Sequence, residues 1–174
     1  MDGYLLDTNH LIPLLRDHHP HRTAVLKELA MASTDAPVYV ATATLAELEV
    51  GCCIGAKERS EAQTEIREVI RGNRLSVLEF TKHTAVEYGA LKAVLMRKYN
   101  REGVKRAAKW PEVWTSPDKG VTLGVDEFDL LVVSHAIERR LVLATTDQML
   151  RILEGLNSGA DGLNVISWVP AHVP

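Results

Sequence analysis

The sequence has few of the features that mark secreted or membrane-spanning proteins. It holds two cysteines, and because Cys52 and Cys53 are adjacent they cannot supply the separated pairs of a disulfide framework. No apolar run approaches the roughly 20 residues that a membrane-spanning helix needs. No charged-then-apolar leader precedes the first apolar segment. These absences predict a cytoplasmic protein with no membrane contact.

The chain also lacks an excess of basic residues. Its 20 Lys and Arg residues stand against 23 Asp and Glu residues, which gives a formal net charge of −3. Proteins that coat nucleic acid by charge alone usually carry an evident basic excess, so that class is not favoured. An enzyme that cuts nucleic acid at an acidic metal site is still compatible, because its metal-binding carboxylates lower the total.

What the 174 residues do contain is a regular alternation of short apolar segments and helical patterns. This length favours one domain, 1–174, with a sizeable core. The alternation predicts an α/β fold, a three-layer α/β/α sandwich around a parallel sheet of about five strands. The expected strands are 4–7, 38–42, 75–80, 141–145 and 163–168.

The first expected strand ends in Asp7, and two polar residues, Thr8 and Asn9, follow at once. In open α/β sheets, ligands bind in the crevice beyond the carboxyl ends of the strands, so Asp7 is a candidate site residue. The alternative is that these residues simply form a turn, because Asp and Asn side chains often bond to their own backbone.

Three later carboxylates have comparable positions: Glu47 after the second strand, Asp129 early in the helix before the fourth, and Asp147 after the fourth. Each of them also has a local explanation, as a turn former, a cap or a partner of the helix dipole. Glu47 could complete a capping box with Thr44. Asp129 could stabilise the positive end of its helix, with Asp126 as the N-cap.

Taken together, the four carboxylates indicate a metal site. Clustered carboxylates repel one another unless cations neutralise them. Oxygen ligands suit Mg²⁺ or Mn²⁺, which activate water and stabilise the leaving oxygen during phosphodiester cleavage. Thr8, Asn9 and Thr145 are placed to orient the carboxylates through hydrogen bonds.

Two other features deserve an interpretation. His18, His19 and His21 flank Pro20, and no cysteine or carboxylate is spaced to complete a metal site with them, so a solvated loop is expected. The segment 97–119 holds seven basic residues against three acids, with Trp110 and Trp114. Such residues can bind a phosphate backbone and stack bases. Packing of the tryptophans on the domain or on a second subunit is the favoured alternative.

Four segments resemble, in order, the motifs of PIN-domain nucleases, and most closely the VapC-type toxins of prokaryotic toxin–antitoxin pairs. They are Leu-Leu-Asp-Thr-Asn at 5–9, Ala-Glu-Leu-Glu-Val-Gly at 46–51, Asp-Leu-Leu-Val-Val-Ser-His-Ala at 129–136 and Leu-Val-Leu-Ala-Thr-Thr-Asp at 141–147. The resemblance implies a Mg²⁺-dependent endoribonuclease, a homodimer, and an antitoxin partner that blocks the site. It also implies that the catalytic, metal-binding residues are Asp7, Glu47, Asp129 and Asp147.

Some alternatives stay open at this point. Glu49 and Asp126 compete for two of the four roles. Glu47 is preferred because Gly51, expected to allow a close backbone approach, follows it at the family's spacing. Asp129 is preferred because the apolar helix follows it directly. The insert at about 100–121 is longer than a minimal domain of this kind needs.

Two other functions compete with the nuclease. A non-catalytic RNA- or protein-binding module would keep the fold without turnover. A haloacid-dehalogenase-type phosphatase would need a second Asp where Asn9 stands, and so it is disfavoured.

Overall fold

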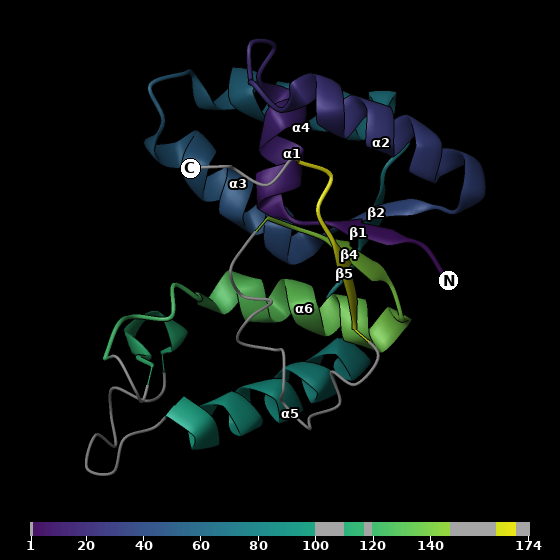
Figure 1. The fold of residues 1–174 in the computed structure, drawn as a ribbon. Coiled ribbons are helices and arrows are strands. Elements are labelled where there is room, and N and C mark those ends of the chain that lie inside the picture. The colour runs from purple at the N-terminus through teal and green to yellow at the C-terminus, as the bar shows by residue number, and fades with distance from the viewer. Residues whose placement is uncertain (1, 100–109, 117–119, 147–162, 170–174) are drawn as a thin grey trace.

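In the computed structural model, residues 2–99, 110–116, 120–146 and 163–169 are described (Figure 1). Within these ranges five parallel strands form one sheet in the order β3-β2-β1-β4-β5. The strands are β1 (Tyr4–Leu6), β2 (Val38–Ala41), β3 (Ser76–Leu78), β4 (Val142–Ala144) and β5 (Asn164–Ile166). The two strands that carry candidate site residues at their carboxyl ends, β1 and β4, are neighbours, so these residues start from the same edge of the sheet.

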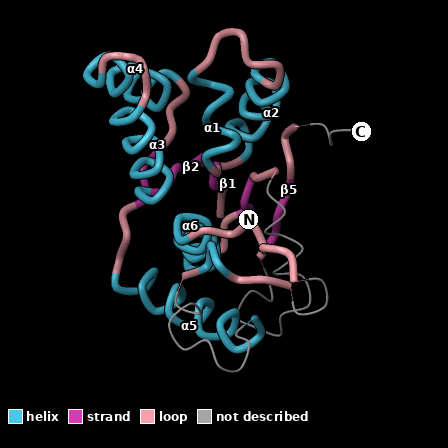
Figure 2. Tube along the Cα trace, turned by 90° about the vertical axis from the view of Figure 1, so that its left-hand side faces the viewer, coloured by secondary structure: helices cyan, strands magenta, loops and turns pink. Residues whose placement is uncertain are grey.

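Helices cover both faces of the sheet, which confirms the expected three-layer α/β/α sandwich. Helices α5 and α6 lie on one face, whereas α1, α2 and α4 lie on the other (Figures 1 and 2). Helix α3 packs against α1, α4 and α6. The helices are α1 (Thr8–Leu15), α2 (Arg22–Asp35), α3 (Thr42–Ile54), α4 (Arg59–Gly72), α5 (Lys82–Tyr99) and α6 (Glu127–Arg139), with a short 3₁₀ helix, η2 (Pro111–Val113).

The central strand β1 feeds two separate cores. Leu5 is buried among residues of α5 and α6, including Leu130. Leu6 is buried on the opposite face among residues of α1 and α2, including Leu11 and Val25. Successive side chains of a strand point to opposite faces, so a strand covered on both sides must be apolar at consecutive positions. This explains the unbroken apolar run that precedes Asp7.

Helix α1 contains a proline beyond its first turn. It starts at Thr8, and Pro13 is its sixth residue. A proline there removes one hydrogen bond of the helix. In the last turn of the helix, Arg22 Nη1 donates to two carbonyl oxygens that have no partner within the helix, those of Pro13, at 3.3 Å, and Leu14.

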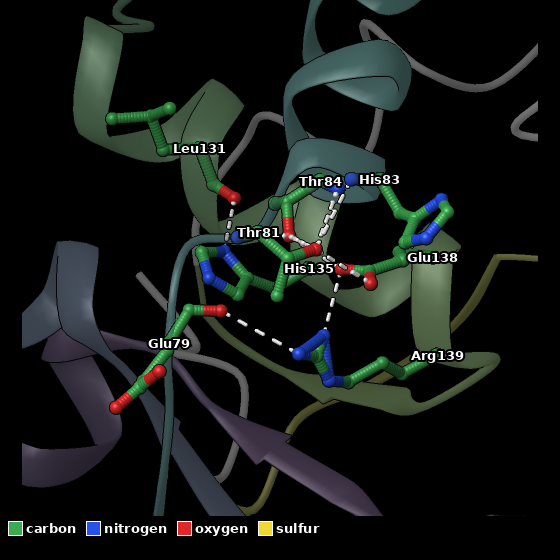
Figure 3. Close-up of polar contacts among 8 residues, drawn as sticks. All are labelled: Glu79, Thr81, His83, Thr84, Leu131, His135, Glu138 and Arg139. Carbon is green, nitrogen blue, oxygen red and sulfur yellow. Dashed lines mark hydrogen bonds and ion pairs between the residues drawn. The ribbon is translucent and has the colours of Figure 1, made fainter.

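The turn between β3 and α5 is fastened to α6 by hydrogen bonds (Figure 3). The Glu138 carboxylate accepts from the hydroxyl of Thr81 at 3.0 Å and from that of Thr84. Arg139 Nη1 donates to Glu138 Oε2 at 2.7 Å. The two threonines also cap α5, because each hydroxyl accepts a hydrogen bond from the other's backbone N–H. Helices α5 and α6 are therefore held as a pair on their face of the sheet.

The basic and aromatic insert is described only in part. Trp114 is buried in the core with α5 and α6, which confirms the expected packing for this tryptophan. Trp110 is exposed. The rest of the expected insert, at 100–109 and 117–119, lies outside the described residues. Among the helices that are described, none combines the length and apolarity needed to cross a bilayer.

Candidate active site

Asp7 ends up buried at the carboxyl end of β1, with an exposed fraction of 4%. It is also the N-cap of α1, and its Oδ1 accepts a hydrogen bond from Thr8 N at 2.8 Å. Its Oδ2 accepts from Asn9 Nδ2 at 2.9 Å and from Thr145 Oγ1 at 2.6 Å. A buried carboxylate needs such donors, because burial without partners would cost several kcal/mol. The bond from Thr145 also ties the end of β1 to the end of β4.

His10 fixes the orientation of the Asn9 side chain behind Asp7. The buried His10 ring accepts a hydrogen bond at Nε2 from the Trp168 backbone N–H, at 3.0 Å. The neutral ring must then carry its proton on Nδ1, which lies 2.6 Å from Asn9 Oδ1. Because Asn9 Oδ1 accepts this proton, its Nδ2 is the group that faces Asp7 and Thr145, at 2.9 Å from each.

His10 stays neutral in this arrangement. Burial, with a smaller contribution from the charge of His21, lowers the pKa of the His10 ring from 6.5 to about 4. Protonation would place a second N–H on Nε2, directly opposite the Trp168 N–H that now donates to it. The neutral ring is therefore part of the support of the Asp7 site.

Glu47 is linked to the same site through Thr8. The Thr8 hydroxyl donates to Glu47 Oε2 at 2.5 Å. The capping box expected between Thr44 and Glu47 is wrong, because α3 begins at Thr42 with Ala41 as its N-cap. Thr44 is thus inside the helix, and the Glu47 side chain reaches across to α1 instead of back to its own helix end.

The competing acid on α3 points elsewhere. Glu49 Oε2 accepts from Gln63 Nε2 at 2.7 Å and lies 3.6 Å from Arg59 Nη2, and both partners belong to α4. The expectation that Gly51 permits a close backbone approach is also wrong, since a Cβ at this position would meet no atom within 4 Å outside its own helix, among the described residues. Gly51 instead lines an open groove.

Asp126 and Asp129 form a capping box at the start of α6. Asp126 is the N-cap, and its Oδ1 accepts from Asp129 N at 2.9 Å. Asp129 Oδ2 accepts from Asp126 N at 2.8 Å. The expected N-cap is therefore confirmed, and both acids have a local structural role. Whether Asp129 also binds a metal stays a prediction.

The described residues bring two of the four predicted acids, Asp7 and Glu47, to neighbouring positions on either side of Thr8. Across those residues, no three His, Cys, Asp or Glu side chains come close enough together to form a metal site, the histidine loop at 18–21 included. A place for Asp129 beside Asp7 and Glu47 stays a prediction. Asp147 lies outside the described residues. The hydrogen bonds predicted for Thr8, Asn9 and Thr145 are present, but their service to a metal stays a prediction.

A groove of about 800 Å³ opens beside the Thr8–Glu47 contact. It runs between α1, α3 and α4, and its walls mix apolar side chains, such as Ile12 and Ile66, with charged ones, such as Lys57. Ile54, at the end of α3, lines this groove with 82% of its surface exposed. The site therefore adjoins a surface that could receive an apolar chain.

Comparison with known proteins decides the family. A family model described as PIN domain matches residues 4–156, most of the chain. The chain belongs to the PIN-domain family. The expected assignment to this family and its fold is thus confirmed. A search of curated proteins found no match.

Solved structures share the fold of this PIN-domain chain at low sequence identity. One is VapBC2 from Rickettsia felis bound to a DNA fragment from its promoter, with 21% identity and a TM-score of 0.67 over 95% of this chain and 98% of that chain. Another is DNA-bound VapBC from Salmonella typhimurium, with 23% identity and a TM-score of 0.64 over 97% and 99%. A third is VapBC-5 from Mycobacterium tuberculosis, a member of the VapBC family of toxin–antitoxin systems, with 18% identity and a TM-score of 0.52 over 96% and 98%.

Sequence reasoning missed one residue of this PIN-domain site. His10 lies three positions after Asp7, at the spacing that places side chains on one helix face together with Leu11 and Leu14. That spacing could have indicated a buried histidine behind the carboxylate. The partner at its other ring nitrogen, Trp168, could not be read from the sequence, because it comes from the opposite end of the chain.

We expect the stability of the protein to depend on the protonation of His10. Between pH 6.5 and about 4 the unfolded chain binds a proton at His10 that the folded chain does not, so the free energy of unfolding falls as the pH falls through this range. The loss attributable to His10 is on the order of 3 kcal/mol. Urea unfolding at a series of pH values measures it.

The control is His10→Gln, which keeps polar atoms near both partners but does not titrate. Burial also lowers the pKa of His135, so both proteins share that contribution and the difference between their pH profiles isolates His10. Parallel profiles for the parent and His10→Gln between pH 4 and 6.5 would contradict the assignment.

Proposed function

We propose that this PIN-domain protein is a Mg²⁺-dependent endoribonuclease, with Mn²⁺ as a possible substitute. The observation that carries the proposal is the buried Asp7 carboxylate at the junction of β1 and β4, held by Thr8, Asn9 and Thr145. A carboxylate oriented this firmly, at the sheet edge where α/β folds bind ligands, is suited to hold a cation in a fixed place.

The side chains at this site carry the oxygen donors that a hard divalent cation prefers. Asp7 and Glu47 offer oxygen donors, the ligands that Mg²⁺ prefers, and no cysteine or histidine is needed. In the proposal Asp7 and Glu47 hold the ion together with Asp129 and Asp147. When bound, such an ion lowers the pKa of a coordinated water and stabilises the charge that develops on the leaving oxygen of a phosphodiester.

The protein's own contribution is orientation. Thr145 and Asn9 donate to the same Asp7 oxygen, so Oδ2 is fixed between two donors and the carboxylate plane cannot rotate freely. Thr8 holds Glu47 in the same way from the other side. Neutral His10 keeps Asn9 from flipping its amide. This pre-organisation lowers the reorganisation needed when substrate charge develops.

We further propose that the protein acts as the toxin of a toxin–antitoxin pair and forms a homodimer. The four motifs that resemble VapC-type toxins support this role, and VapBC complexes share the fold. The groove between α1, α3 and α4 supplies a place for an antitoxin, because a chain seated there would also contact Thr8 and Glu47. Occupation of the groove would then block the site.

We predict that Asp7→Asn lowers Mg²⁺-dependent RNA cleavage by at least about 100-fold while the fold is kept. Asn has the shape of Asp and can still cap α1, but it lacks the charge that binds the cation. Thr145→Val removes one orienting bond and is expected to weaken the apparent Mg²⁺ affinity by about 10- to 100-fold. A gel assay on single-stranded RNA, with Mg²⁺ titrated into metal-stripped protein, measures both effects.

Glu49→Gln is the matched control. Glu49 lies on the same helix as Glu47 but bonds to Gln63 and faces Arg59, so its loss should leave cleavage unchanged. If Asp7→Asn cleaves RNA as the parent does, the proposed metal site fails. If the parent neither binds Mg²⁺ nor cleaves RNA, the non-catalytic binding module is the better account.

The partner role predicts a defect for Ile54→Asp. A charge on this exposed residue of the groove should disrupt an apolar contact without disturbing the core. When the antitoxin that the proposal requires is co-expressed, we expect it to inhibit the parent and to bind Ile54→Asp more weakly by at least about tenfold. Calorimetric titration of the purified proteins measures the affinities.

Met31→Asp is the control for that experiment, because Met31 is 57% exposed on α2 and does not line the groove. Equal binding of the partner by Ile54→Asp and by the parent would show that the groove is not the docking surface. An antitoxin that binds the parent but leaves its RNA cleavage unaffected would contradict the toxin role itself.

A further inference from the structure

Trp110 is the one tryptophan of this chain that is open to solvent. The sequence has three tryptophans, and all three are among the described residues. Trp114 and Trp168 are buried, with exposed fractions of 2% and 6%, whereas Trp110 is 58% exposed. An exposed indole is unusual enough to ask what holds it and what could cover it.

The backbone that carries Trp110 is anchored. The 3₁₀ helix η2 follows it directly, and Trp114 N donates to Pro111 O at 3.0 Å. Trp114 is part of the core, and its carbonyl oxygen accepts from Leu123 N at 2.9 Å. Trp110 therefore begins a segment that is tied to the core four residues later.

One face of the Trp110 ring is already occupied by a cation. Lys92 Nζ lies 5.9 Å from the ring centroid, which is within the range of a cation–π interaction. Lys92 is itself held in place, because its Nζ donates to both carboxylate oxygens of Glu127, at 2.6 and 2.8 Å, and to Tyr88 Oη at 2.7 Å. With 58% of its surface exposed, Trp110 still offers ring area to a ligand.

Through Lys92 the ring is linked to the start of α6. Glu127, the partner of Lys92, is the first residue of α6, between Asp126 and Asp129 of the capping box. Figure 1 shows the η2 segment beside the end of α6 at which that helix begins. The exposed Arg97 and Lys98 in the last turn of α5 add positive charge on the helix that carries Lys92.

We propose that Trp110 is a stacking platform for an unpaired base of single-stranded RNA, so that it positions the substrate beside the α6 end of the active site. The inference rests on the proposed nuclease function and adds a residue that contacts its substrate. A flat exposed ring in contact with α5, a helix that also carries the exposed Arg97 and Lys98, matches the chemistry of a base on an anionic backbone. An apolar protein partner would gain nothing from the charges of Arg97 and Lys98.

The test uses the full-length Asp7→Asn protein, which binds RNA without cutting it in this account. An oligoadenylate of about six nucleotides is the probe, because every base has a face that can stack. Since the other two tryptophans are buried, quenching of the indole emission on titration reports on Trp110. We expect the quenching to saturate with the binding curve measured from the anisotropy of the labelled probe.

Three variants on the Asp7→Asn background identify the role of the ring. Trp110→Leu keeps apolar area but cannot stack, and is expected to weaken probe binding on the order of tenfold. Trp110→Phe should give an affinity between the two. Val121→Ala, a truncation of an exposed apolar side chain in the loop that precedes α6, should change the affinity by less than about twofold. Unchanged melting temperatures establish that the folds are intact.

The inference is overturned if Trp110→Leu binds the probe as the Asp7→Asn protein does, or if it changes the oligomeric state in sedimentation and so identifies the ring as a subunit contact. These outcomes are separate from failure of the proposed nuclease. If Trp110→Leu, made with Asp7 intact, cleaves RNA as well as the parent does, the nuclease proposal stands and the stacking proposal fails. If the parent cleaves no RNA but its binding of the probe depends on Trp110, the stacking proposal stands and the nuclease proposal fails.

Discussion

The structure depends on a constraint set by one buried carboxylate. Asp7 sits where the two central strands end, and a carboxylate there must be satisfied by donors or it would destabilise the core. The donors come from the start of α1 and from Thr145, at the end of β4. The same group that caps a helix therefore also joins two strands. Since these contacts fix both oxygens of Asp7, the geometry that stabilises the fold also orients the carboxylate for a ligand.

This constraint reaches across the whole chain through Asn9 and His10. The His10 ring connects the Asn9 amide to the backbone of Trp168, so a residue that follows the last strand helps to set the position of a carboxylate that follows the first. The low pKa of the ring keeps it in the one protonation state that suits both partners. Stability and site geometry are thus coupled in this part of the molecule, and conditions that charge His10 should disturb both.

The sequence was sufficient for those features that follow from local patterns. Apolar runs alternating with helical periods gave the parallel sheet and its layers, and Asp126 was recognisable as a cap. Features that depend on contacts between distant segments were not predictable. Thr44 and Glu47 have the spacing of a capping box, yet the helix starts two residues earlier and Glu47 bonds to Thr8. Gly51 has the spacing of a close contact but faces open space. For the site, the roles of Asp129 and Asp147 rest on the motifs alone.

The central claim is that Asp7 is a ligand of a catalytic divalent cation, and a crystal soaked in Mn²⁺ tests it most directly. The account predicts an anomalous difference peak about 2.1 Å from an Asp7 carboxylate oxygen, on the side away from Asn9 and Thr145, with Glu47 in the same coordination sphere. Soaked crystals of Asp7→Asn should lose the peak. The account would be contradicted if saturating Mn²⁺ gave no anomalous difference peak at Asp7 while the protein still cleaved RNA in the same buffer.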